Sequence, residues 1–194
     1  SDDSDTPNPY GEGPMDGFAT RDLLDARVAS SHQGRVEVHG LDVADDLSRH
    51  YTFAEAILTA LSGDPPDRKT GALFEVCCHF AAPISVAEAP AHVSRITEVI
   101  ATAPGGAVGA TCVALAEQVQ FQTDRLAEFR EWLDEPTGQP PDVAFEYDEA
   151  LDGLSESFAA RVAELEADVP GIRDGMAFWP QLLAALHVCG LRDD

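Results

Sequence analysis

The stretch from Val38 to Gly63 constrains the fold most strongly, because it specifies a helix with two defined ends and one apolar face. Thr52 and Glu55 have the spacing of a capping box, in which each side chain accepts a hydrogen bond from a backbone amide that the helix leaves unpaired. Apolar residues then recur every three or four positions until Gly63 and two nearby prolines end the pattern. The buried face of this helix is expected to consist of Phe53, Ile57, Ala60 and Leu61.

The remaining sequence predicts one hairpin and several further helices. Residues 27–31 and 35–39 alternate around His32-Gln33-Gly34, which is typical of a β-hairpin. The rest follows the three- and four-residue period of helices, so the fold class is mainly α. Helices are expected at 42–47, 67–82, 91–102, 107–133, 147–167 and 176–189, with Ile96, Val99 and Ile100 buried and the last helix bent or restarted at Pro180.

The length of 194 residues and the apolar content of 44% suit one main hydrophobic core. Residues 1–19 are polar and acidic, and we expect a disordered tail there. Residues 20–134 hold most of the apolar helical pattern and are the expected core. Residues 135–142 contain three prolines and one glycine, which predicts a linker before a C-terminal helical segment at 143–194.

The chain is strongly acidic, with 35 Asp and Glu against 12 Lys and Arg and a formal charge of −23. Lys69 is its single lysine. Phosphate binding requires clustered cations, so nucleic acid and anionic membranes are excluded as partners. We interpret the charge as halophilic, because concentrated salt screens the repulsion between carboxylates. With no long apolar run and no signal-like segment, the expected location is a high-salt cytoplasm.

The usual motifs for cofactors and metals do not occur in the sequence. Gly105-Gly106 and Gly109 lack the strand and spacing of a dinucleotide loop, and neither a Walker motif nor a G-x-S-x-G elbow is present. The four cysteines lack C-x-x-C spacing and lie in apolar helical patterns, so we expect buried free thiols and no metal site. These are Cys77, Cys78, Cys112 and Cys189.

Several local motifs occur together in the order of a known enzyme family. A hairpin strand leads into Gly40 and Asp42, then into Phe53-Ala54-Glu55-Ala56, and the helix ends as Leu61-x-Gly63-x-x-Pro66. From about Arg27 to about Ala116, this order resembles the N-terminal part of the citrate synthase and citryl-CoA lyase superfamily. The resemblance implies a citrate-synthase-like large-domain core at 20–134 and a reduced small domain at 143–194.

The resemblance also implies where catalytic residues should lie. In that family two histidines and an aspartate perform acid–base chemistry on an acyl-CoA and a carbonyl compound, the first histidine lying in a His-Gly-Gly loop. Here Gly105–Ala116 is similar to the helix before that loop, but Glu117–Phe121 follows without His-Gly, and no Gly-His segment occurs later. His79, where the family often has Asp-His, is the candidate catalytic residue. No cofactor is expected, and a CoA ester would bind only to an active protein.

Three functions are compatible with this pattern. The first is a non-catalytic protein that works by association, either as a homodimer or with a full-length citrate-synthase-like protein. The second is a citryl-CoA lyase-like enzyme that completes its active site with another subunit. The third is a carboxylate or CoA-ester sensor, because Arg suits bidentate carboxylate binding and Arg35, Arg49 and Arg95 are candidates. The family dimerises through this region, and the expected dimer interface comprises Gly105, Gly109, Ala110 and Ala114.

Overall fold

A small antiparallel sheet opens the described part of the computed structural model, which covers residues 29–32, 35–82, 88–100, 104–146 and 151–191. Strands β1 (Ala29–His32), β2 (Arg35–Val38) and β3 (Leu41–Asp42) pair in sequence order, which confirms the predicted hairpin. The third strand forms because His39 and Gly40 both have positive φ, as a two-residue hairpin turn requires. The His39 ring nitrogen Nε2 lies 3.3 Å from the Ala60 carbonyl oxygen and joins this turn to helix α3 (Phe53–Ser62).

The predicted capping box is confirmed, and aspartates cap two of the neighbouring helices. Asp42 caps the π-helical turn η1 (Val43–Leu47), which continues into α2 (Ser48–His50). Helix α3 (Phe53–Ser62) has the complete capping box of Thr52 and Glu55, and ends at Gly63 with φ of 91°. Helix α4 (Arg68–Ala81) begins where the Asp67 carboxylate accepts hydrogen bonds from the amides of residues 69 and 70.

The predicted buried face of α3 is wrong in part. Phe53 is 83% exposed and Leu61 62% exposed, whereas Leu58 and Thr59 are buried. The reason is that α4 packs on one side of α3 only, so it covers part of a wide apolar stripe. Of the predicted set, Ile57 packs against the core.

The core lies between α4 and three later helices, α7 (Ala127–Asp134), α8 (Asp152–Glu164) and α9 (Phe178–Val188). Phe80, Phe158 and Phe178 form an aromatic cluster with ring centroids 5.2 to 6.4 Å apart. The short 3-10 helix η2 (Asp142–Phe145) adds the fully buried Ala144. One contiguous core therefore connects residues 58 to 189. Its other fully enclosed members include Leu58, Leu73, Cys77 and Phe129.

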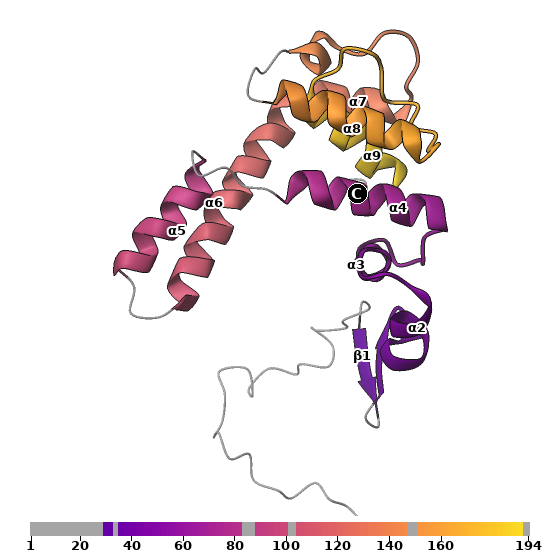
Figure 1. Cartoon of the computed structure of the whole chain (residues 1–194), viewed down its shortest axis with the longest axis vertical. Coiled ribbons are helices and arrows are strands. Elements are labelled where there is room, and N and C mark those ends of the chain that lie inside the picture. Colours follow the sequence, from indigo (N-terminus) through magenta and orange to yellow (C-terminus); the bar gives the residue numbers. More distant parts are fainter. Residues whose placement is uncertain (1–28, 33–34, 83–87, 101–103, 147–150, 192–194) are drawn as a thin grey trace, which may run out of the picture.

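Helices α5 (Ala89–Ile100) and α6 (Pro104–Arg125) pack against each other and extend away from the core as an arm (Figure 1). The sequence predicted one helix over 107–133, but it divides into α6 and α7 at Leu126. Leu126 leaves helical geometry, with φ of −97° and ψ of 15°, and buries its side chain in the core. The break therefore sets the angle between arm and core.

Two further helix predictions need correction. Ile96, Val99 and Ile100 are 59%, 74% and 75% exposed, because α6 covers only the small-residue side of α5. Pro180 does not bend α9, because the helix begins at Phe178 and Pro180 lies in its first turn, where backbone N–H groups need no helical partner. The described helix α8 spans 152–164 of the predicted 147–167; residues 147–150 and the predicted tail at 1–19 lie outside the described residues.

Candidate functional site

The candidate catalytic residue His79 is exposed on α4, in an open groove between α4 and α8. The groove has a volume of about 490 Å³, and its floor includes Val76 and Phe80. Its polar lining comprises His79, Glu75, Ser157, Arg161 and Glu164, and the last two form an ion pair of 2.6 Å. General acid–base catalysis needs a group within hydrogen-bond reach of a second reacting group. Among the lining residues there is one imidazole and no second one to polarise a carbonyl.

The three candidate carboxylate-binding arginines do not converge. Arg35 and Arg49 both approach Asp45, at 3.5 and 3.2 Å, beside the N-terminal sheet. Arg95 lies on the arm and pairs with Glu98 at 2.6 Å. All three guanidinium groups are exposed and already paired with acids of this chain. The structure therefore places them in two separate regions.

The buried carboxylate of Asp42 lies beside Arg35. Hydrogen bonds from the backbone amides of Asp45 and Ala44 hold the pKa of Asp42 below its usual value, and the positive charge of Arg35 adds to the effect. Asp42 is also the N-cap of η1. The Arg35–Asp42 contact, at 3.9 Å, therefore joins the sheet to a helix cap, which is a structural role.

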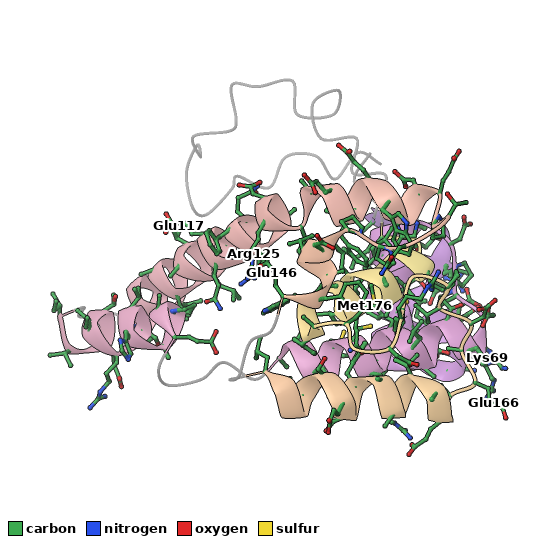
Figure 2. All side chains as sticks on the ribbon, turned by 90° about the horizontal axis from the view of Figure 1, so that it is seen from above. Lys69, Glu117, Arg125, Glu146, Glu166 and Met176 are labelled. Atoms are coloured by element: carbon green, nitrogen blue, oxygen red, sulfur yellow. The ribbon has the colours of Figure 1, made fainter. Side chains whose placement is uncertain are left out.

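A small cavity that the sequence did not predict lies where the arm meets the core. It has a volume of about 70 Å³, enough for a few water molecules. Arg125, the last residue of α6, forms an ion pair with Glu146 beside it, and its Nε lies 3.1 Å from that carboxylate (Figure 2). Residues 21 positions apart build this contact, so no local sequence pattern could have identified it.

A hydrogen-bond network lies beside this cavity, and two of its members, Ser155 and Met176, line it. The Gln181 amide donates to Ser155 Oγ at 2.9 Å and to the Met176 carbonyl oxygen at 2.7 Å. Ser155 Oγ donates to the same carbonyl at 2.8 Å. Gln181 Oε1 is buried and, among the described atoms, has no hydrogen-bond partner. The network fixes the chain before α9, and the cavity is too small for an acyl-CoA.

The predicted interface residues lie on two different faces of α6. Gly105 and Gly109 are exposed, and a Cβ added to either would meet no atom within 4 Å. Ala110 and Ala114 are half-buried on the side of α5, where Gln118 Nε2 donates to the Glu88 carboxylate at 2.5 Å. Ala110 and Ala114 therefore pack within the chain, whereas Gly105 and Gly109 face solvent.

The arm carries most of the large apolar side chains that the described chain leaves exposed. Soluble monomers rarely expose extensive apolar surface unless it binds something. No charged residue occurs between Glu98 and Glu117, in a chain with a net charge of −23. The exposed apolar residues of the arm are Ile96, Val99, Ile100, Val108, Val113, Leu115, Val119 and Phe121.

The cysteines differ in burial. Cys77 and Cys189 are buried free thiols, as predicted, and Cys78 is half-buried. The prediction was wrong for Cys112, which is exposed because α5 covers only one side of α6. The part of the chain that the structure describes holds no group of three His, Cys, Asp or Glu able to bind a metal ion. Within the same residues, no helix is long and apolar enough to cross a membrane.

Comparison with known proteins identifies the fold. No family model matches the chain, and no curated protein matches it. The structure of citryl-CoA lyase from Hydrogenobacter thermophilus superposes with a TM-score of 0.65 and 14% sequence identity. The match covers 86% of this chain and 76% of that one. The chain therefore has the mainly helical, citrate-synthase-like fold that its N-terminal motifs predicted.

Proposed function

We propose that this chain, which has the fold of citryl-CoA lyase, is a non-catalytic member of that structural class and acts by associating with a second copy of itself through the α5–α6 arm. The observation that carries the proposal is the exposed apolar surface of the arm. Removing such surface from water is the main favourable term in protein association. Because the tip of the arm is uncharged, two acidic chains can approach there with the least repulsion.

The absence of convergent acid–base groups in the described residues supports a non-catalytic role. His79 lies in an open groove, and the candidate arginines are paired with acids elsewhere. Catalysis on an acyl-CoA requires preorganised groups in a site that excludes water. The groove beside His79 is open to solvent and offers no such enclosure.

Light scattering in concentrated KCl tests the association. We expect a dimer at micromolar concentration, and we expect Gly109→Leu to shift it towards monomer with helicity retained. The monomer should tolerate this leucine, because a Cβ built at Gly109 meets no atom within 4 Å. Leucine also favours a helix more than glycine does. Gly153→Leu on α8 is the matched control, since that glycine is also helical and open. A monomeric wild-type protein would refute the proposal.

A second candidate function is citryl-CoA cleavage with catalytic groups supplied by another subunit. The fold match and the position of His79 in a groove of about 490 Å³ favour it. Its test is an assay of citryl-CoA cleavage by the chain alone and mixed with a full-length citrate-synthase-like protein. Turnover that falls at least tenfold with His79→Ala, but not with the surface control His92→Ala, would establish this function in place of the first.

A further inference from the structure

The arm formed by α5 and α6 joins α7 at an interruption of the backbone hydrogen bonding. Within the described residues, neither α5 nor α6 packs broadly on any element of the core (Figure 1). At the junction the Leu126 amide donates to the Gln122 carbonyl oxygen at 3.0 Å, and the Arg130 amide donates to the Leu126 carbonyl oxygen at 2.9 Å. Residues 127–129, also described, make no such bond to residues 123–125, which would be their partners in one continuous helix. A few residues at the end of an element, free to change their backbone angles, are what a hinge requires.

Leu126 anchors this junction to the core. Its side chain is buried and belongs to the hydrophobic core, whereas its backbone lies outside helical geometry. Rotation of α6 about this residue therefore leaves the buried side chain in place. The residue that ends the arm is fixed, and the helix before it is not.

The cavity of about 70 Å³ gives the end of α6 room to move. Gln122, Arg125 and Leu126 line the cavity from the arm. Close-packed interiors resist movement because each side chain fills the space between its neighbours. Empty space at the junction removes part of that resistance. The core contributes lining residues from η2 and from α9, among them Val143, Phe145, Phe178 and Pro180.

An ion pair crosses the junction. Glu146, which follows η2 on the core side, accepts hydrogen bonds from Nε and Nη2 of Arg125, the last residue of α6 (Figure 2). The two side chains are 38% and 53% exposed, and ion pairs in contact with water are weak. Such a pair holds one orientation of the arm and releases it at low cost.

We infer that residues 123–129 are a hinge between the arm and the core, and that the ion pair of Arg125 and Glu146 is the latch that holds it. When the ion pair opens, the arm pivots about Leu126. Because the arm carries most of the exposed apolar residues, the hinge sets the direction in which the chain presents that surface. The hinge is a property of the single chain, so this inference goes beyond the proposed function and does not depend on it.

The distance between two spin labels, measured by pulsed electron paramagnetic resonance, tests the hinge. In a Cys112→Ser background, labels are attached to Gly105→Cys near the tip of the arm and to Glu156→Cys on α8, both at exposed positions. Gly105 lies twenty positions before Arg125, about 30 Å along the helix, so a small rotation produces a large displacement. An excess of unlabelled protein removes distances between chains from the signal, and brief labelling spares the native thiols of the core.

The latch predicts how the width of the distance distribution responds to substitution. Wild type should give a narrow distribution, and Glu146→Gln should widen it at least twofold with helicity retained. Glu164→Gln is the matched control, because it removes the exposed ion pair with Arg161 inside α8 and should leave the width unchanged. The charge-swapped double variant, Arg125→Glu with Glu146→Arg, should restore the narrow distribution.

A second single variant protects the test against one that fails to fold. Arg125→Gln should widen the distribution as Glu146→Gln does, and circular dichroism confirms the helicity of each variant. An unchanged width in the folded single variants, or a wild-type distribution that is already broad, overturns the inference. Light scattering separates this result from the proposed function, because a monomeric wild type with a latched arm overturns the proposed function alone.

Discussion

The Nζ of Lys69 donates a hydrogen bond of 3.3 Å to the backbone carbonyl oxygen of Glu166, 97 residues later (Figure 2). Lys69 is the single lysine of the chain and lies in the first turn of α4. Glu166 follows the end of α8 with a left-handed backbone, φ of 51°, where the last carbonyl groups of a helix lack internal partners. The contact therefore fastens the end of α8 to the start of α4.

Removing this donor should lower stability slightly. We expect Lys69→Met to cost about 0.5–1 kcal/mol, at the low end for a hydrogen bond because the side chain is exposed. For a chain of this length that corresponds to a loss of about 2 °C in melting temperature. Lys69→Arg keeps a donor and is the control in thermal unfolding followed by circular dichroism. Equal losses in both variants would contradict the assigned role.

Gly171 is required by close packing in the core. A Cβ at this position would lie 2.5 Å from Leu133 Cδ2 and 2.9 Å from Ala184 Cβ. Overfilling a packed core costs about 1–3 kcal/mol, so Gly171→Ala should lower the melting temperature by about 3–10 °C. Gly153→Ala, on the open side of α8, is the control and should cause no loss. An unchanged melting temperature for Gly171→Ala would contradict the described packing.

Local interactions explain which parts of the fold the sequence could predict. The capping box of Thr52 and Glu55 and the N-cap at Asp67 involve residues at most three positions apart, so their spacing alone specifies them. The hairpin turn at His39 and Gly40 was not predicted, although a glycine after a polar residue is a typical signal for it. The overall fold was predicted from the order of several such motifs.

The burial of individual residues and the candidate site could be predicted only in part, because both depend on which segments cover each helix face. Ile96 and Phe53 recur at helical spacing like core residues, yet both are more than half exposed. Periodicity identifies an apolar face and gives no information on whether its partner lies in the same chain. The cavity at Arg125 and Glu146 is built by contacts between distant segments, so it left no local pattern.

The Asp67 cap should give part of the stability a defined pH dependence. Hydrogen bonds from the Thr70 amide and hydroxyl hold the pKa of Asp67 below its usual value of 3.8. A carboxyl whose pKa is lower in the folded chain stabilises it fully above the unfolded pKa, and this contribution is lost as pH falls through the folded pKa. Below about pH 4, wild type should therefore lose stability more steeply than Asp67→Asn in urea unfolding. If the free energy of unfolding falls equally steeply with pH in the two proteins, the assigned role of Asp67 is contradicted.

Salt should stabilise the folded chain. With a net charge of −23, its carboxylates repel one another over the Debye length, which grows from about 8 Å at 0.15 M to about 30 Å at 0.01 M. Helicity measured by circular dichroism should therefore fall as KCl is removed and recover when it is restored. NaCl should act equally, because the effect is screening. Full helicity and an unchanged melting temperature at 0.01 M salt would refute the halophilic interpretation.

The four thiols should react with a disulfide reagent at very different rates. Thiolate is the reactive form, so both burial and a raised pKa slow the reaction. Burial raises the pKa of Cys189 to about 12 and raises the pKa of Cys77 further. Burial is also the main cause of the smaller rise in the pKa of half-buried Cys78. Cys112 is exposed on α6. At pH 8 one thiol per chain should react rapidly, and Cys112→Ser should abolish that phase.

This fast phase also reports on the arm, because Cys112 lies on α6 among the exposed apolar residues of that helix. If a second copy covers the exposed apolar surface of the arm, the fast reaction should slow as protein concentration rises, and Gly109→Leu should restore the rate of the dilute protein. The reaction of Cys77 and Cys189 should not depend on concentration, since both are enclosed by the core of a single chain. Rapid reaction of either buried thiol in the folded protein would contradict the packing of α4 against α9.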